Sequence, residues 1–166
     1  MSSLVVIAND IRSAHNVGAL FRTASGAGVE KIFLTGYTLV PAPAGKLYLT
    51  RAEKDLAKTA LGAEHEIPFE HEEDVKECLS NLKKLGYTII GLEQSDTSID
   101  YRTKPASDKV ALLLGTEVEG IPASLQDMCD ALYEIPMAGQ KNSLNVSVAA
   151  GIALYALQDV RGGSNL

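Results

Sequence analysis

Three short stretches of the 166-residue sequence combine polar side chains and glycines in a way that could support chemistry on a bound ligand. They cover residues 9–24, 112–122 and 135–147. Each lies where an apolar run typical of a buried strand comes to its end. Ligands of open α/β sheets bind beyond the carboxyl ends of the strands, so all three stretches are candidates for a functional site.

The first stretch is a loop of turn-forming residues that leads into a predicted helix. Asn16 is a candidate N-terminal cap of that helix, and Gly18 leaves room for another backbone or a ligand to come close. Arg22 follows Gly18 by four residues, so the two lie one turn apart on the same helix face. Because apolar residues flank Arg22, its guanidinium is expected to point into a cleft. The alternative is an arginine that extends along the surface into water.

The second stretch, Gly115-Thr116-Glu117-Val118-Glu119-Gly120, follows an apolar run and resembles the glycine-rich turn that binds dinucleotides. Glu117 stands where that turn has its middle glycine, and a carboxylate there would repel a pyrophosphate. This argues against a nicotinamide or flavin cofactor. A glycine-lined turn beside an acid could instead hold a ligand without phosphates, and S-adenosylmethionine is one. The alternative is a tight turn with two solvated acids.

The third stretch runs from a strand through Ile135-Pro136-Met137 and a polar loop into a long predicted helix that Ser143 caps. Ser143, Asn145 and Ser147 place small polar groups at the start of this helix. Backbone N–H groups and the helix dipole favour an anion there, such as a phosphate of RNA. Ordinary capping is the alternative.

The elements that must position these stretches alternate along the chain. Strands are predicted at residues 4–8, 31–35, 87–92, 110–114 and 132–135, and a loop at 36–50. Helices are predicted at 16–27, 52–61, 72–85, from Pro122 at the first helical position to about 129, and at 144–160. Nearly continuous apolar strands that alternate with helices predict an α/β domain with a mostly parallel sheet and helices on both faces.

Composition and charge restrict the function classes further. The net charge of −6 argues against a nucleic-acid partner, but residues 1–60 carry a net charge of +3 and residues 61–166 a net charge of −9. A local basic face and a merely acidic, solvated second half both fit this asymmetry. No apolar run is long enough for a membrane span, and the first residues do not resemble a signal peptide. Cys78 and Cys129 are isolated, so we expect a cytoplasmic protein without a metal site.

Taken in order, the three stretches resemble the signature motifs of the SpoU/TrmH branch of the SPOUT RNA methyltransferases, the superfamily with the alpha/beta knot. Asn16, Gly18 and Arg22, followed by Thr-Ala, match the first motif. Gly115, Glu117 and Gly120 match the second, and Ile-Pro-Met with Ser-Leu-Asn-Val-Ser within residues 135–147 matches the third. The resemblance spans essentially the whole chain. We therefore expect one domain over residues 1–166, without an N-terminal RNA-binding extension.

The resemblance implies a fold, a reaction and an assembly. The fold would end in a deep C-terminal trefoil knot, and the protein would be a homodimer with residues of both protomers near each active site. The reaction would move a methyl group from S-adenosylmethionine to a ribose 2′-hydroxyl of tRNA or rRNA and leave S-adenosylhomocysteine. Two alternatives stay open: an RNA base methyltransferase, and a non-catalytic RNA-binding domain that kept the fold. Intact Arg22, Glu117 and Asn145 argue against the second of these.

The resemblance also implies roles for single residues. Arg22 would stabilise the developing alkoxide and anchor a phosphate, because a guanidinium stays charged and is a poor base. Asn145 would orient the ribose, Ser143 would hold a phosphate, and Asn16 and Glu117 would position Arg22. The adenosine would be held at Leu92, Gly115, Ile135, Met137 and Leu144. RNA phosphates would meet cationic side chains, namely Arg12, Lys46, Arg51, Lys54, Lys58 and Lys141.

Overall fold

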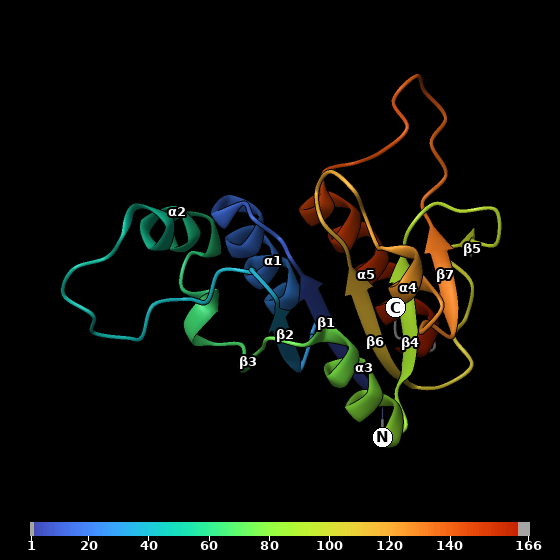
Figure 1. The fold of residues 1–166 in the computed structure, drawn as a ribbon, viewed down its shortest axis with the longest axis horizontal. Coiled ribbons are helices and arrows are strands. Elements are labelled where there is room, and N and C mark those ends of the chain that lie inside the picture. Colours follow the sequence, from blue (N-terminus) through green and yellow to red (C-terminus); the bar gives the residue numbers. More distant parts are fainter. Residues whose placement is uncertain (1, 163–166) are drawn as a thin grey trace.

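A parallel sheet forms the centre of the computed structural model, which describes residues 2–162 (Figure 1). Its seven strands lie in the order β3-β2-β1-β6-β4-β7-β5, and every pairing between these strands is parallel. The strands are β1 (Ser3–Asn9), β2 (Lys31–Thr35), β3 (Phe69–Glu72), β4 (Thr88–Leu92), β5 (Ile99–Asp100), β6 (Lys109–Leu114) and β7 (Ala131–Glu134). The predicted α/β class and parallel sheet are confirmed.

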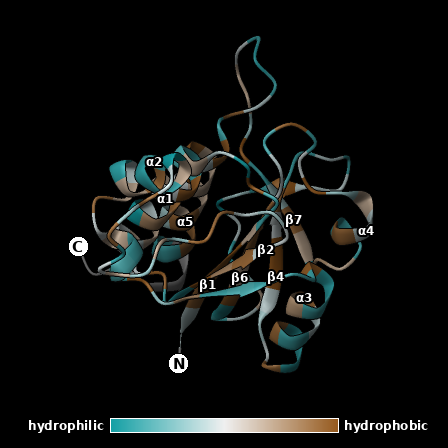
Figure 2. Ribbon diagram, turned by 60° about the vertical axis from the view of Figure 1, so that its left-hand side comes forward, coloured by the Kyte–Doolittle hydropathy of each residue, from teal (hydrophilic) through white to brown (hydrophobic). Residues whose placement is uncertain are grey.

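Helices cover both faces of the sheet, as predicted, and form two layers around it (Figure 2). One layer holds α1 (Ala14–Gly26), α2 (Arg51–Ala60) and α5 (Val146–Gly162). The other layer holds α3 (Val75–Lys84) and the short α4 (Ala123–Gln126). A single 3₁₀ turn, η1 (Ala63–His65), follows α2.

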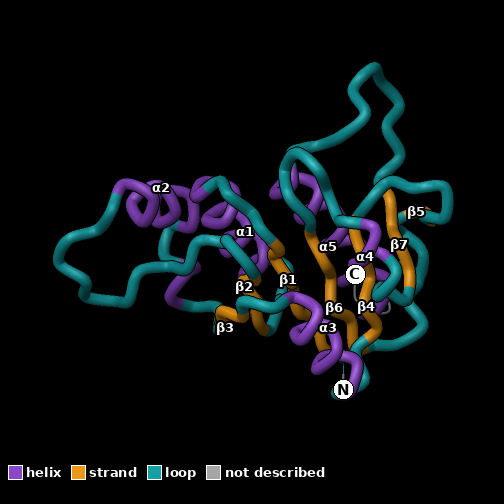
Figure 3. Tube along the Cα trace, in the orientation of Figure 1, coloured by secondary structure: helices purple, strands orange, loops and turns teal. Residues whose placement is uncertain are grey.

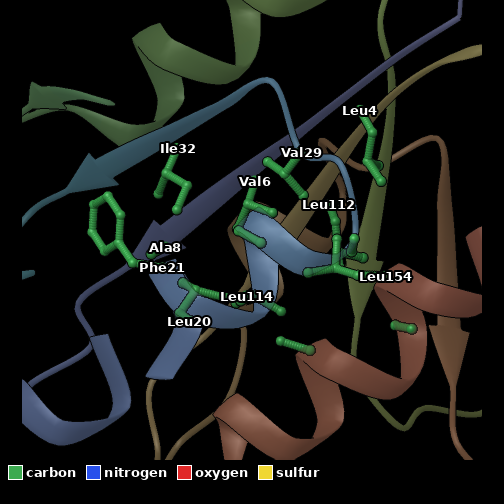
Figure 4. Close-up of a cluster of buried hydrophobic side chains, with 14 of the residues drawn as sticks. Leu4, Val6, Ala8, Leu20, Phe21, Val29, Ile32, Leu112, Leu114 and Leu154 are labelled. Atoms are coloured by element: carbon green, nitrogen blue, oxygen red, sulfur yellow. The ribbon is translucent and has the colours of Figure 1, made fainter. Parts of the chain in front are cut away.

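Alternate side chains of the central strands enter two separate hydrophobic cores. Val6 and Leu112 face the layer of α1 and α5, where they meet Phe21 and Leu154 (Figure 4). The intervening side chains on β1 and β6 face α3 and α4 instead. Because both faces are covered, β1 is buried along its whole length, which explains its nearly unbroken apolar sequence.

Both strands at the edges of the sheet were missing from the sequence prediction. β3 reads Phe-Glu-His-Glu and is only partly covered, while β5 has two residues. Edge strands are often short or charged, which limits unwanted pairing with other chains and removes the apolar signal of a buried strand. The predicted helix from residue 72 was wrong at its start: Glu72 ends β3, and Asp74 caps α3 by accepting a hydrogen bond from Lys76 N at 2.8 Å.

Two helix starts near the first and second motifs also differ from the prediction. α1 begins at Ala14, because Ser13 and not Asn16 is the cap; its Oγ accepts a hydrogen bond from Asn16 N at 3.2 Å. Pro122 lies just before α4 rather than in its first turn, and α4 ends at Gln126. The cap position of Ser13 leaves the Asn16 side chain free for contacts between segments.

Gly18 lets α1 and α2 approach each other closely. A Cβ at Gly18 would overlap Oγ1 of Thr59 and the backbone oxygen of Leu56. Thr59 Oγ1 also donates a hydrogen bond to the carbonyl of His15 at 2.9 Å, so the two helices are joined at this point. Of the two roles predicted for Gly18, the close approach of a backbone is the one that the structure shows.

Candidate functional site

A pocket of about 230 Å³ opens beyond the carboxyl ends of β4, β6 and β7, where the sheet order predicts a ligand site. The turn after β6 forms one wall, and the loop between β7 and α5 forms another. That loop rises away from the sheet before it returns to the first turn of α5 (Figures 1 and 3). The pocket therefore draws on the second and third motifs together.

Every residue predicted to hold the adenosine lines this one pocket. They are Leu92 from β4, Gly115 after β6, and Ile135, Met137 and Leu144 after β7. Ser143 and Glu117, predicted for other roles, also line it. Tyr133, Val146 and Ala149 were missed, and they add an aromatic ring and apolar surface to the walls.

Two glycines give the turn after β6 its shape. Thr116 and Gly120 exchange backbone hydrogen bonds in both directions, each at 3.1 Å, which closes the turn. A Cβ at Gly115 would overlap the backbone of Gly120, and Gly120 itself has a φ of 68°. The turn can therefore hold its shape only with these small residues.

Glu93 fixes this turn from the neighbouring strand. Its Oε2 accepts a hydrogen bond from the backbone N–H of Ile121 at 2.7 Å and lies where a Cβ of Gly120 would be. Glu93 also lines the pocket, directly after Leu92 at the end of β4. Sequence reasoning missed it, although its place at a strand end is the signal that marked the other three stretches.

The pocket wall carries an excess of negative charge. Four carboxylates line it, and no lysine or arginine is among the lining residues that the structure describes. The four are Glu93, Glu117, Glu119 and Glu134. The hydrogen-bond donors to Glu93, Glu117 and Glu134 are neutral: Glu134 Oε2, for example, accepts from the hydroxyl of Ser98 at 2.6 Å. An acidic, partly enclosed wall favours a ligand with positive charge.

A chain of hydrogen bonds joins all three motifs beside the pocket. The amide Nδ2 of Asn145 donates to Oδ1 of Asn16 at 3.1 Å, and Nδ2 of Asn16 donates to Oε1 of Glu117 at 3.3 Å. The backbone N–H groups of Ser13 and Arg12 donate to the same carboxylate at 3.0 and 3.3 Å. The loop after β1, the turn after β6 and the start of α5 are thereby held in one arrangement.

Asn145 also caps α5, the role predicted for Ser143. Its Oδ1 accepts hydrogen bonds from the backbone N–H and the hydroxyl of Ser147 at 2.9 and 2.6 Å. The helix accordingly begins at Val146 rather than Leu144, so the predicted cap and start were wrong. Ser143 lies on the loop before the helix with its side chain exposed at the pocket.

The charge of Glu117 is stabilised by this arrangement. Burial alone would raise the pKa of its carboxyl group, but the hydrogen bonds from the backbone N–H groups of Ser13, of Glu117 itself and of Arg12, and from the amide of Asn16, outweigh burial and hold the pKa below its usual value. Glu117 is therefore an anion at neutral pH. Its carboxylate accepts the hydrogen bonds that hold the first motif beside the pocket.

Arg22 lies apart from this pocket within the single chain. It is exposed on α1 and is not among the pocket-lining residues, and its side chain makes no hydrogen bond or ion pair with the side chains that the structure describes. The cleft expected for its guanidinium is therefore not found in one chain. Asn16 and Glu117, predicted to position Arg22, bond to each other instead.

The cations predicted to contact RNA fall into two groups. Arg12 and Lys141 are exposed next to the pocket, on the loops of the first and third motifs. The others belong to the end of the β2–α2 loop and to α2, where Lys46 pairs with Glu53 at 2.7 Å and Arg51 lies 4.0 Å from Asp55. Lys54 and Lys58 are exposed on α2 and form no ion pair with described residues.

Neither cysteine has the properties of a nucleophile. Burial raises the pKa of the Cys78 thiol to about 12 and that of Cys129 to about 11, so both stay protonated at neutral pH.

Among the described residues there is no group of three or more His, Cys, Asp or Glu side chains that could hold a metal ion. None of the described helices combines the length and the apolar character that crossing a membrane requires.

The fold and the site define a parallel α/β protein with an acidic ligand pocket that is lined by the second and third motifs and hydrogen-bonded to the first. Residues 3–155 match the model of the SpoU rRNA Methylase family. The chain belongs to this family.

Similar sequences carry names of RNA methyltransferases. The chain is 33% identical over 153 residues to a Staphylococcus haemolyticus protein assigned to the TrmH family of tRNA/rRNA methyltransferases. It is 36% identical over 157 residues to the 23S rRNA (guanosine-2′-O-)-methyltransferase RlmB of Xanthomonas axonopodis pv. citri. In both cases 92% of this chain matches 57% of the relative, so the chain spans little more than half the length of these relatives.

Solved structures share the fold. An AdoMet-bound rRNA methyltransferase from Sinorhizobium meliloti superimposes with a TM-score of 0.81 at 28% identity, over 95% of this chain and 56% of that one. The TrmH/SpoU tRNA modifying enzyme of A. aeolicus superimposes with a TM-score of 0.78 at 26% identity, over 95% of this chain and 75% of that one.

Proposed function

We propose that this chain transfers the methyl group of S-adenosylmethionine to a ribose 2′-hydroxyl of tRNA or rRNA in the cytoplasm. The pocket carries the proposal, because it gathers every residue expected to hold the adenosine and because its described lining has four carboxylates and no lysine or arginine. A sulfonium cation suits such a wall. Family membership and the ribose-methylating relative from Xanthomonas support the type of reaction.

The chemistry needs a methyl donor and an activated oxygen. Bound S-adenosylmethionine would supply the methyl group as an electrophile on its sulfonium. The 2′-oxygen would form a bond to the methyl carbon as the carbon–sulfur bond breaks, and the hydroxyl proton would pass to a neighbouring phosphate or a water. The sulfur would leave as a neutral thioether, so the product would lack the positive charge that the acidic wall favours.

The hydrogen-bonded chain beside the pocket has a positioning role in this proposal. Glu117 fixes Asn16, and Asn16 fixes the amide of Asn145, which would orient the ribose. Ser143 is exposed at the pocket and would hold a phosphate of the substrate. Preorganised groups of this kind accelerate transfer by placing the attacking oxygen in line with the methyl carbon.

The placement of Arg22 supports an active site made by two chains. A guanidinium that stabilises the alkoxide must reach the pocket, and Arg22 does not do so within its own chain. α5 meanwhile exposes Val148 and Tyr155, together with Leu144 just before the helix, beside the pocket residue Ala149. We propose a homodimer that buries this apolar stripe, with Arg22 of the partner subunit completing each site. The trefoil knot implied by the family resemblance is part of the same proposal.

One assay tests the reaction. Purified protein is incubated with radiolabelled S-adenosylmethionine and with tRNA and rRNA separately, and the RNA is digested to nucleosides. Label in 2′-O-methylnucleosides is expected. Label in base-methylated nucleosides would support the base methyltransferase instead, and RNA binding without any labelled product would support the non-catalytic binding domain.

A mixing experiment tests the shared site. Arg22→Ala and Asn145→Ala homodimers are each expected to be inactive, but co-refolded mixtures should regain activity, because one site of a mixed dimer has both side chains intact. Light scattering on the same samples measures the mass. If the mixture stays inactive although mixed dimers form, Arg22 acts within its own chain.

A further inference from the structure

Two large apolar side chains extend almost fully into solvent where the β2–α2 loop approaches α2. Leu47 is 89% exposed and Tyr48 is 87% exposed, whereas Leu49 turns inward and is partly buried. The loop extends away from the sheet before it reaches α2 (Figure 3). Single exposed apolar residues are common on proteins, but two adjacent ones at a projecting position indicate a contact surface.

This stretch of loop is held in a defined shape. Lys46 Nζ donates to both carboxylate oxygens of Glu53, at 2.7 and 3.0 Å. Thr50 N donates to Glu53 Oε2 at 2.8 Å, and Thr50 Oγ1 accepts from Glu53 N at 3.2 Å, which forms a capping box at the start of α2. Glu53 thus fixes Lys46 and Thr50, the residues on either side of Leu47, Tyr48 and Leu49. These bonds fix the backbone on both sides of Tyr48, and the Tyr48 side chain points into solvent.

The surroundings of Tyr48 are positively charged. Arg51 has a side chain that is 96% exposed and lies 4.0 Å from Asp55. Lys54 and Lys58 follow on α2 without an ion pair to described residues, so cations outnumber acids in residues 46–58. The acid in this stretch that lies nearest in sequence, Glu53, is bound to Lys46. The chain has a net charge of −6, so a local group of cations is unusual in it. Cations beside an exposed aromatic ring are complementary to a nucleic acid, which has anionic phosphates and planar bases.

We propose that Leu47 and Tyr48 form a stacking platform for unpaired nucleotides of the substrate RNA. A base would lie against the ring of Tyr48 while Arg51, Lys54 and Lys58 contact the flanking phosphates. Bases in a duplex are already stacked, so the platform selects single-stranded loops or ends. The proposal rests on RNA as the substrate, as proposed above, and adds a binding site outside the methyl-transfer pocket.

Substitutions of Tyr48 separate stacking from plain hydrophobic contact. The probe is a fluorescein-labelled, single-stranded RNA 12-mer of mixed sequence, measured by anisotropy against the full chain. Tyr48→Phe keeps the ring and should bind within about twofold of the wild type, whereas Tyr48→Leu and Tyr48→Ala should each weaken binding about tenfold or more. A duplex of the same sequence should respond by less than about twofold, since it has few free bases.

Tyr37→Leu is the matched control. Tyr37 is 82% exposed and lies just after β2, outside the stretch that Glu53 holds. Its loss should leave the affinity for the 12-mer unchanged. Calorimetry with S-adenosylmethionine and light scattering should report unchanged cofactor affinity and unchanged mass for every variant.

Each negative result of this experiment has a different meaning. If Tyr48→Leu binds the 12-mer as well as the wild type, the platform does not exist. If Tyr48→Ala lowers the mass of the assembly, the patch holds a second copy of the chain and not RNA. If the wild type methylates RNA while Tyr48→Ala binds it normally, the platform is wrong and the proposed function stands. If RNA binding depends on Tyr48 but no methyl group is ever transferred, the platform stands and the proposed function is wrong.

Discussion

The Nδ2 atom of Asn145 donates a hydrogen bond to Oδ1 of Asn16 at 3.1 Å, although 129 residues separate the two along the chain. Each of these amides has a second partner: Asn16 reaches Glu117, and Asn145 caps α5. The pair therefore fixes the first motif relative to the start of α5 at the end of the third motif.

Replacing Asn16 by alanine should separate positioning from cofactor binding. The variant removes both bonds that join Glu117 to Asn145, while the pocket lining stays intact. We expect methyl transfer to fall on the order of 100-fold, because small displacements of a positioning group are that costly. The dissociation constant of S-adenosylmethionine should stay within about twofold. Asn81→Ala, an exposed asparagine of α3, should leave both values unchanged.

Replacing Arg22 by alanine should abolish transfer with little effect on cofactor affinity. Loss of a group that stabilises a developing charge lowers the rate by roughly 100- to 1000-fold. Arg22 does not line the pocket of its own chain, so calorimetry should find S-adenosylmethionine bound within a few fold of the wild type. Arg22→Lys keeps the charge and loses the planar fork, and should recover part of the rate. Near-normal turnover by the alanine variant would remove Arg22 from the mechanism.

Reversing the charges of Lys54 and Lys58 together should weaken RNA binding and flatten its dependence on salt. Each phosphate contact adds roughly 0.7 to the slope of log affinity against log salt for single-stranded RNA. Titrations at several salt concentrations should show a slope that is smaller by about one unit or more. The matched control carries Lys76→Glu and Lys84→Glu on α3, which lies on the other face of the sheet. An equal loss in the control would mean that only net charge matters.

Adding one methyl group at Gly18 should destabilise the fold. The new Cβ would overlap Thr59 and the backbone of Leu56, so α1 and α2 must move apart. Overpacking of this kind costs about 1–3 kcal/mol in the free energy of unfolding, measured by urea titration. Gly139→Ala is the control, since a Cβ there meets no atom within 4 Å. It should leave the unfolding midpoint nearly unchanged.

The dependence of stability on pH should include a contribution from Glu117. Its pKa is lower in the folded protein than the usual value of 4.5, so the bonds from Ser13 and Asn16 contribute stability that is present above that value. The contribution is lost as the pH falls through the lowered pKa of the folded state. The difference in the free energy of unfolding between the wild type and Glu117→Gln, measured by urea titration, should therefore be constant from about pH 8 to pH 5 and shrink only below the usual carboxyl pKa.

The central part of the fold could be predicted from sequence, and the edges could not. β1, β2, β4, β6 and β7 lie where apolar runs placed them, because strands buried on both faces need apolar side chains throughout. β3 carries two glutamates and a histidine at the edge of the sheet, and β5 is two residues long. Neither has a periodic signal, so strand pairing alone defines them.

The residues of the site could be predicted from sequence, but their hydrogen-bond partners could not. Motif spacing identified the residues that meet at the pocket, yet the partner of each polar side chain depends on the distance between loops that are far apart in sequence. Ser13 competes with Asn16 for the cap of α1, and Asn145 competes with Ser143 for the cap of α5. Local preference permits either member of each pair. The contact between Asn16 and Asn145 favours the arrangement seen in the structure.

The order of the strands has a consequence for synthesis on the ribosome. β1 lies between β2, which follows it closely, and β6, which begins only at Lys109. While the first hundred or so residues emerge, one side of a mostly apolar strand has no neighbour to pair with. At about 5–20 residues per second, this exposure lasts on the order of ten seconds. An unpaired apolar strand edge promotes aggregation, so we expect the nascent chain to depend on chaperones until β6 has formed.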